Sequence, residues 1–431
     1  MAAARAFGWG AIARLGLVQA SIGAVVVLTT STLNRIMVVE LALPALVPGL
    51  LVAFHYVVQV MRPRLGHGSD QGARRTPWIV GGMAMLAAGG ALAAAATVWM
   101  ASDRGAGLAL AVAAFALIGV GVASAGTTLL VLLAQRVAPE RRAGAATLVW
   151  LMMIAGFAVT AGIAGQMLDP YSPTRLLAVC GSVSLLAFAI TLAATWRLEG
   201  AGAGLAETAA PRVPFGVAFR QVWHDAEARR FTVFVFVSML AFSAQDLILE
   251  PFAGAVLGYT PGASTRLSGV QHGGVLAGML LAALAGRRRF GSLRRWTAWG
   301  CIASALALAA LATAGLLGPP WPLRANVFVL GAANGAFSIA AIGSMMRLAG
   351  DGREPRAGMR MGLWGAAQAM AFALGGLVGT AASDAARWLV GRPGPAYGAV
   401  FALEALLFVV AAALAVRSTP TASAPRLVLA A

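Results

Sequence analysis

Two histidines lie inside long apolar stretches, where an ionisable side chain is costly and is therefore a candidate for function. They are His55 and His272, and two glycines follow the second one directly. A neutral imidazole can ligate a metal ion such as the magnesium of a chlorin, and the glycines would leave room for a flat ring. Gln59 and Gln271 offer alternative oxygen ligands. The competing interpretation of each histidine is a hydrogen-bonded residue of the core.

Charged and amide side chains also gather at two places within apolar stretches. They are Asn34, Arg35 and Glu40 early in the chain, and Gln245, Asp246 and Glu250 past its middle. Asp246 and Glu250 are four residues apart, so they share one helix face. The pattern predicts a polar cluster that gates the protein or binds a ligand. The alternatives are a structural ion pair, or residues at the level of the lipid headgroups. Glu404 is a lone acid in the last apolar stretch.

The composition excludes a soluble protein. Of the 431 residues, 60% are hydrophobic and 11% are charged, against about 25% charged residues in an average soluble chain. The mean hydropathy is +0.82. The formal charge of +17 comes from arginine alone, because the chain has no lysine. These arginines lie in short loops between apolar runs, so orientation in a lipid bilayer explains them better than nucleic-acid binding.

The apolar runs predict an all-α polytopic membrane protein with twelve transmembrane helices, since each crossing needs roughly 20 apolar residues. The predicted spans are 15–39, 44–61, 77–100, 108–134, 145–168, 174–196, 231–257, 266–286, 296–317, 323–346, 359–381 and 396–416. With both termini in the cytoplasm, 25 of the 32 arginines fall on the cytoplasmic side and 7 on the other. This asymmetry favours a multi-pass protein of the bacterial inner membrane in that orientation.

The polar segment between the sixth and seventh spans predicts how the chain is divided. Residues 1–196 form an N-terminal six-helix half, 197–230 a cytoplasmic linker, 231–417 a C-terminal half and 418–431 a cytoplasmic tail. Within the linker, apolar residues recur at helical spacing opposite charged ones, which is typical of an amphipathic helix at the membrane surface. The alternative is an ordinary linker.

The two halves match when the chain is shifted by 214 residues. Glu140, Arg142 and Trp150 then fall on Glu354, Arg356 and Trp364. Two similar six-helix halves are typical of the major facilitator fold. The loop after the second span agrees with that fold, because Gly66, Asp70, Arg74 and Arg75 fit its loop motif, although Ala73 replaces the second glycine. Asp70 is expected to cap a helix start or to pair with an arginine.

Longer segments resemble one family within this fold. Residues 14–19 and 32–41, the stretch from Ser69 to Ile79, and residues 244–252 are similar to signatures of the PucC/LhaA proteins. These form the bacteriochlorophyll delivery branch of the major facilitator superfamily. The short loop after the second span places the chain nearer to the branch encoded with bacteriochlorophyll synthesis genes.

The resemblance implies a membrane assembly factor rather than an enzyme. Such a factor would bind bacteriochlorophyll a as cargo and deliver it to nascent light-harvesting or reaction-centre polypeptides of a purple phototroph. Its expected partners are bacteriochlorophyll synthase, those polypeptides, the membrane insertion machinery and the lipid bilayer, and no nucleic acid. The pigment would lie near His55 or His272.

Other functions stay open at this point. One is a proton-coupled transporter of a small solute that uses Asp246, Glu250 or Arg35. Another is an accessory or catalytic chain of bacteriochlorophyll synthase, and a third is a scaffold that binds the synthase without touching pigment. The sequence contains no P-loop and no G-x-S-x-G motif, and we expect no metal site built from protein ligands alone.

Overall fold

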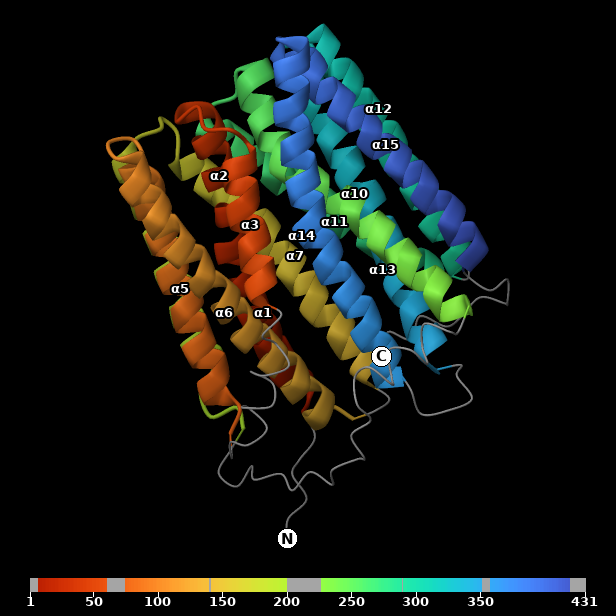
Figure 1. Cartoon of the computed structure of the whole chain (residues 1–431). Helices are drawn as coiled ribbons and strands as arrows, with labels where there is room; N and C mark the ends of the chain where they lie inside the picture. The colour runs from red at the N-terminus through yellow and green to blue at the C-terminus, as the bar shows by residue number, and fades with distance from the viewer. Residues whose placement is uncertain are drawn as a thin grey trace. The chain divides into compact units, whose positions relative to one another are not determined.

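The computed structural model describes residues 7–59, 74–138, 141–199, 226–288, 290–350 and 357–418, and the statements below concern these residues. They form twelve helices and no strand, which confirms the predicted all-α fold (Figure 1). The predicted loop residues Gly66 and Asp70, and most of the predicted linker, lie outside the described residues.

The first helix is continuous from Trp9 to Glu40 and comprises α1 (Trp9–Val27), η1 (Leu28–Thr32), α2 (Leu33–Arg35) and η2 (Ile36–Glu40). The others are α3 (Leu46–Val58), α5 (Thr76–Trp99), α6 (Arg104–Arg136), α7 (Arg142–Met167), α8 (Pro173–Thr195), α10 (Ala226–Leu257), α11 (Pro261–Arg287), α12 (Leu293–Leu317), α13 (Leu323–Gly350), α14 (Ala357–Val390) and α15 (Pro393–Ser418). Eleven of these twelve helices are long and apolar enough to cross a membrane. The chain is therefore a multi-pass membrane protein.

The remaining helix, α3, lies within the predicted second span, 44–61. It has 13 residues, and because residues 60 and 61 lie outside the described residues, the far end of this span stays a prediction. The span is predicted to begin at Pro44, but the helix begins two residues later, at Leu46, after Ala45 in a turn.

Helix ends depart from the predicted spans where local polar contacts prolong a helix. The eleventh span is predicted to stop at residue 381, but α14 continues to Val390. Asp384 and Arg387, which lower the hydropathy there, form an ion pair with each other one turn apart, so the helix tolerates them. It ends before Gly391, whose φ of 69° favours glycine.

The described residues fall into two compact units, and each is described by itself. Unit 1 contains those within 1–206 and 253–272, and unit 2 those within 207–252 and 273–427. In unit 1, α5 packs against α6 and α8, while α1 packs against α7 and α8. In unit 2, α12 packs against α13 and α15. The predicted division into two six-helix halves around the linker stays a prediction.

Glycine allows two corresponding helix pairs to approach closely. At Gly121 of α6, an added Cβ would lie 2.6 Å from the Leu86 nitrogen of α5, and at Gly300 of α12 it would lie 2.7 Å from the Phe337 nitrogen of α13. The shift of 214 residues places Leu86 on Gly300. Small residues at such crossings let membrane helices pack by van der Waals contact, and here both units use them between equivalent helices.

Candidate functional site

The end of the first helix departs from α-helical geometry around Arg35. Two π-helical segments, η1 and η2, flank the three residues of α2, and such segments are often found at functional sites. The hydroxyls of Thr29 and Thr30 both bond to the carbonyl oxygen of Val26, at 2.8 and 3.0 Å. Hydroxyl groups that bond back to the preceding turn compete with the helical ladder. The irregular stretch carries Asn34 and Arg35 into the interior, where both are buried.

Arg35 forms an ion pair with Glu40, its predicted neighbour in the polar cluster. Its Nη1 lies 2.5 Å from Glu40 Oε1, and its Nη2 donates to the Tyr259 carbonyl oxygen at 2.7 Å. Gly254 makes space for the guanidinium, because an added Cβ would lie 2.9 Å from Nη2. The arginine side chain is 3% exposed and that of Glu40 37%. The pair therefore joins a buried cation to an acid that water or headgroups can reach.

Tyr171, in the turn between α7 and α8, belongs to the same polar cluster. Burial is the largest cause that raises the pKa of its phenol. The carboxylate of Glu40 raises this pKa further, whereas the guanidinium of Arg35 opposes the shift. Sequence reasoning missed this tyrosine, because it is 131 residues from Glu40 and lies in a turn.

A second set of polar contacts, also missed by sequence reasoning, holds the start of α11 against α7. Asp169 accepts a hydrogen bond from Thr260 at 2.7 Å and forms an ion pair with Arg266 at 2.8 Å. Arg266 also donates to the carbonyl oxygen of Gly165 at 3.0 Å. Arg266 lies inside α11, which begins five residues before the predicted span. Two hydroxyl pairs then connect α11 with η1, Thr32–Thr265 at 2.9 Å and Ser31–Ser268 at 3.3 Å.

His272 lies one helical turn after Ser268 in α11. Its Nδ1 lies 2.9 Å from the carbonyl oxygen of Ser268, and the ring of Phe157 meets it edge-on at 4.9 Å. A carbonyl oxygen only accepts, so Nδ1 carries the proton, and the neutral ring has its lone pair on Nε2. That tautomer is the one that a metal ligand needs.

The glycines after His272 differ in the space beside them. At Gly273 an added Cβ would meet nothing within 4 Å, but at Gly274 it would lie 2.3 Å from the Phe328 carbonyl oxygen of α13. The expectation of room for a flat ring therefore applies to Gly273 alone. Gln271, the residue before His272, is also buried.

His55 has the same polarity in a more crowded place. Its Nδ1 lies 2.5 Å from the carbonyl oxygen of Val52, so its lone pair is also on Nε2 in the neutral ring. The ring is 6.4 Å from Phe115, and Gly119 allows α6 to approach the His55 backbone, where an added Cβ would lie 2.7 Å from its carbonyl oxygen. Gln59, at the end of α3, is buried. The structure thus places the two histidines on different helices with different neighbours.

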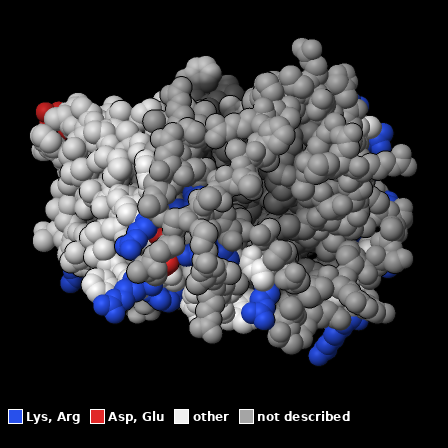
Figure 2. Space-filling view, turned by 90° about the horizontal axis from the view of Figure 1, so that it is seen from below, with Lys and Arg blue, Asp and Glu red and all other residues white. Residues whose placement is uncertain are grey.

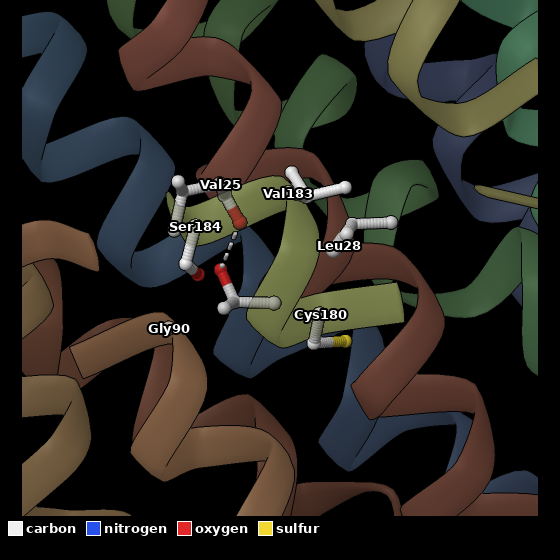
Figure 3. A pocket seen from close by; sticks show the side chains of 7 residues that line it. Val25, Leu28, Gly90, Cys180, Val183 and Ser184 are labelled. Atoms are coloured by element: carbon white, nitrogen blue, oxygen red, sulfur yellow. Dashed lines mark hydrogen bonds between the residues drawn. The ribbon is translucent and has the colours of Figure 1, made fainter. Parts of the chain in front are cut away.

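A narrow crevice in unit 1 lies between the first helix, α5 and α8 (Figure 3). Its volume is about 180 Å³, and it is lined by Val25, Leu28, Thr29, Gly90, Cys180, Val183 and Ser184. The dashed line in the figure is the weak hydrogen bond from the Thr29 hydroxyl to the Val25 carbonyl at 3.4 Å. Ligand sites usually have volumes of about 300–1,000 Å³, so this crevice is too small for a tetrapyrrole.

Glu199 caps the start of α5, and the cap predicted for Asp70 lies outside the described residues. The Glu199 carboxylate accepts hydrogen bonds from the backbone amides of Arg75 at 2.9 Å and of Thr76 at 2.7 Å, and from the Thr76 hydroxyl at 2.6 Å. An acid there complements the positive end of the helix dipole. Arg75 is buried, while Arg74 is exposed. A contact across 124 residues leaves no local signal in the sequence.

The predicted acidic residues of α10 belong to unit 2. Gln245 and Glu250 are each 1% exposed, whereas Asp246 is half-buried. Their polar side chains thus lie within an apolar helix, as the sequence predicts. A single cluster that joins them with Arg35 stays a prediction.

A family model and two curated relatives each match most of the chain. The family model described as PUCC protein matches residues 32–421. The Bacteriochlorophyll synthase 44.5 kDa chain of Rhodobacter capsulatus is 53% identical over 410 residues, 95% of each chain. Protein PucC of the same species is 30% identical over 425 residues, which cover 94% of this chain and 91% of that one.

Among solved structures, a D-xylose-proton symporter matches with a TM-score of 0.70 at 14% identity, over 96% of this chain and 98% of the other. The peptide transporter POT in complex with sulfate gives 0.69 at 14% identity, over 96% and 97%. At such low identity these matches show the fold alone. It is the major facilitator fold, as the internal repeat predicts.

Proposed function

Because this chain belongs to the PUCC protein family, as its sequence predicts, we propose that it binds bacteriochlorophyll and delivers it to nascent light-harvesting or reaction-centre polypeptides. The relatives named for bacteriochlorophyll synthase and for PucC support a role at the junction between pigment synthesis and complex assembly. We place the protein in the bacterial inner membrane, with both termini in the cytoplasm.

The observation that carries the pigment-binding part is the environment of His272. Its Nδ1 contact with the Ser268 carbonyl leaves Nε2 as the lone-pair nitrogen, and the space beside Gly273 is open. An axial nitrogen at Nε2 would bind the magnesium of bacteriochlorophyll a. His55 is the second candidate, because its ring has the same polarity but is 2% exposed, against 8% for His272. Gln271 and Gln59 are the alternative oxygen ligands beside them.

We infer that the pigment is held on an open helix surface. The crevice between the first helix, α5 and α8 is too small for a tetrapyrrole, whereas the exposed sides of the helices carry large apolar residues on which a phytyl tail can lie. On α11 these are Leu280, Leu281 and Leu284, all exposed. One axial ligand and an apolar surface give binding that is reversible, which delivery to another polypeptide requires.

We propose that the chain itself is not an enzyme. A prenyl transferase needs paired acidic motifs for diphosphate and magnesium, and in this sequence only Asp246-x-x-x-Glu250 resembles half of one. The name of the relative at 53% identity, a synthase chain, then fits a partner of bacteriochlorophyll synthase. Purified alone, the chain is expected to show no esterification of bacteriochlorophyllide, whereas a catalytic subunit would show it.

An absorption spectrum tests the pigment proposal. The tagged protein is made in a bacteriochlorophyll-producing phototroph, purified in mild detergent and scanned in the near infrared. We expect stoichiometric bacteriochlorophyll in the unaltered chain and in His224→Ala, the matched histidine control, and a large loss in His272→Ala. His272→Gln keeps an oxygen ligand and should retain an intermediate amount.

Other outcomes distinguish the alternatives. Full pigment in both His272→Ala and His55→Ala would contradict the histidine site. A colourless protein that still co-purifies with bacteriochlorophyll synthase, with antenna polypeptides or with the insertion machinery would be a scaffold. A colourless protein without these partners would contradict the assembly role.

Proton-coupled transport of a small solute is the second candidate function. The specific observation in its favour is the presence of Asp246 and the buried Glu250 in α10, inside a membrane-spanning helix. Intramembrane acids of this kind form proton pathways in transporters. This function predicts uptake into vesicles that collapses when the proton gradient is removed, and a pigment carrier predicts none.

A further inference from the structure

Glu404 is the one acidic residue of α15, and it has no role in the functions proposed above. The residue is 2% exposed, and neither of its carboxyl oxygens has a hydrogen-bond partner among the described residues. An ionised carboxylate in such a place would lose its hydration without any compensating donor. The group therefore needs an explanation other than an ion pair.

Its surroundings come from α10, which lies beside α15 in unit 2. The ring of Phe252 on α10 is 5.1 Å from that of Phe401 and 5.8 Å from that of Tyr397, both on α15. Glu404 follows Phe401 by one helical turn, and the carboxylate of Asp246 on α10 acts on it electrostatically. Glu404 therefore lies on a helix that packs against the acid-bearing helix α10 in unit 2.

The other helices around α15 bring no described cation to this position. On α12, no charged side chain follows Arg295 at its start, and Cys301 is its only thiol. On α14, Asp384 and Arg387 pair with each other, and Arg387 lies over the Tyr397 ring, nearer the beginning of α15.

Two further charged residues lie on α13 and α10. On α13, Arg324 lies at the first turn of the helix, whereas the ring of Phe337, which is 5.7 Å from Phe408, marks where it packs against α15. On α10, Glu250 shares the helix face of Asp246 and is another acid.

We propose that Glu404 is a proton-binding site, in which the carboxyl group holds a hydrogen ion and stays neutral. In a medium of low dielectric constant, a carboxylate without a hydrogen-bond donor takes up a proton. Desolvation favours the neutral form at the more deeply buried group, which is Glu404 rather than the half-buried Asp246. This inference does not depend on pigment binding.

Infrared spectroscopy of the purified full chain in lipid vesicles tests the proposal. A protonated carboxyl group gives a C=O stretching band that is separate from carboxylate bands and shifts when water is exchanged for D2O. We expect this band in the unaltered protein at neutral pH, its loss in Glu404→Gln, and its retention in Asp103→Asn, whose carboxyl is exposed in a turn. Asp246→Asn should shift the frequency of the band because the carboxylate of Asp246 acts on Glu404 electrostatically.

A chemical probe gives a readout that needs no variant. An apolar carbodiimide adds to a protonated carboxyl group in the membrane interior, so mass spectrometry should find the adduct on the peptide that contains Glu404. A wild-type protein without this adduct, or a C=O band unchanged in Glu404→Gln, would overturn the proposal. A band that does not move in Asp246→Asn would contradict the electrostatic effect of Asp246 on Glu404.

Discussion

Arg35 holds together a polar cluster whose members come from several parts of the chain. Its ion pair with Glu40 spans 2.5 Å. The groups that complete their surroundings, the Tyr259 carbonyl and Tyr171, come from turns far along the chain. A turn residue has no periodic pattern, so only the folded chain reveals its contacts.

The ionisation of Tyr171 gives a test of this polar cluster. Burial and the Glu40 carboxylate raise its pKa above the ordinary value of 10.0, while Arg35 lowers it. Glu40→Gln should therefore lower the pKa of Tyr171, as followed by the ultraviolet absorbance of the phenolate. Because the phenol stays protonated longer in the folded chain, its contribution to stability is complete below about pH 10 and is lost as the pH rises through the folded pKa.

Two variants serve as controls for that titration. Tyr171→Phe removes the late-titrating phenol and assigns the signal, and Asp103→Asn removes a distant carboxylate. A tyrosine titration that is the same in Glu40→Gln and in the unaltered protein would show that the acid and the phenol do not interact.

Helices are the scale at which the sequence predicts best, because apolar runs identify them directly. Their ends are predicted less well. The eighth span is predicted to begin at Arg266, but α11 begins five residues earlier, at Pro261, and Arg266 pairs there with Asp169 and the Gly165 carbonyl. The two π segments of the first helix were not predicted, because their backbone register depends on how Thr29 and Thr30 bond to the preceding turn.

The crossing of α7 and α11 predicts different effects for two glycines three residues apart. At Gly165 an added Cβ would lie 2.6 Å from the Arg266 nitrogen, whereas at Gly162 it would meet nothing within 4 Å. Gly165→Ala should destabilise the protein by about 1–3 kcal/mol. Gly162→Ala should be neutral or stabilise it by up to about 1 kcal/mol, because alanine favours the helix.

Thermal unfolding in detergent measures both changes. A lower Tm for Gly165→Ala alone supports the close approach of the two helices. Equal Tm values for the two variants would contradict it.

The start of α5 depends on Glu199, which follows the end of α8. Removing the carboxylate in Glu199→Ala should leave the amides of Arg75 and Thr76 without their acceptor and cost about 1–2 kcal/mol, the usual loss for a helix cap. Glu199→Gln keeps one acceptor oxygen and should have a smaller effect. Hydrogen exchange of the peptide containing Arg75 and Thr76 should be faster in both variants than in the unaltered protein. The increase should be larger in Glu199→Ala than in Glu199→Gln. Unchanged exchange would mean that the cap is not formed in the membrane.

At the scale of the whole molecule, the sequence predicts the fold well. The hydropathy of the sequence and its repeat predicted the major facilitator fold, and the comparison with solved structures confirms it. The face seen in Figure 2 carries several arginines and few acids among the described residues, and the orientation predicted from the arginine count stays a prediction. The functional residues were harder to predict, because membrane helices of this fold serve many different ligands.

Cysteine labelling tests the orientation of the molecule. The background variant has Cys180 and Cys301 replaced by alanine. In it, Ser102→Cys should react with an impermeant maleimide added to spheroplasts, because Ser102 lies in the exposed turn between α5 and α6. Ser423→Cys in the C-terminal tail should react only after the membrane is opened. The reverse pattern would place the arginine-rich side outside and contradict the predicted topology.

The exposed side of α3 has a consequence for the lipid around it. Leu50, Phe54 and Val57 are exposed along this helix, whereas His55 is 2% exposed. Apolar side chains on an open helix face gain free energy when acyl chains rather than water cover them. An amphiphile with a long tail can therefore approach the protein along this face, at the helix that carries His55.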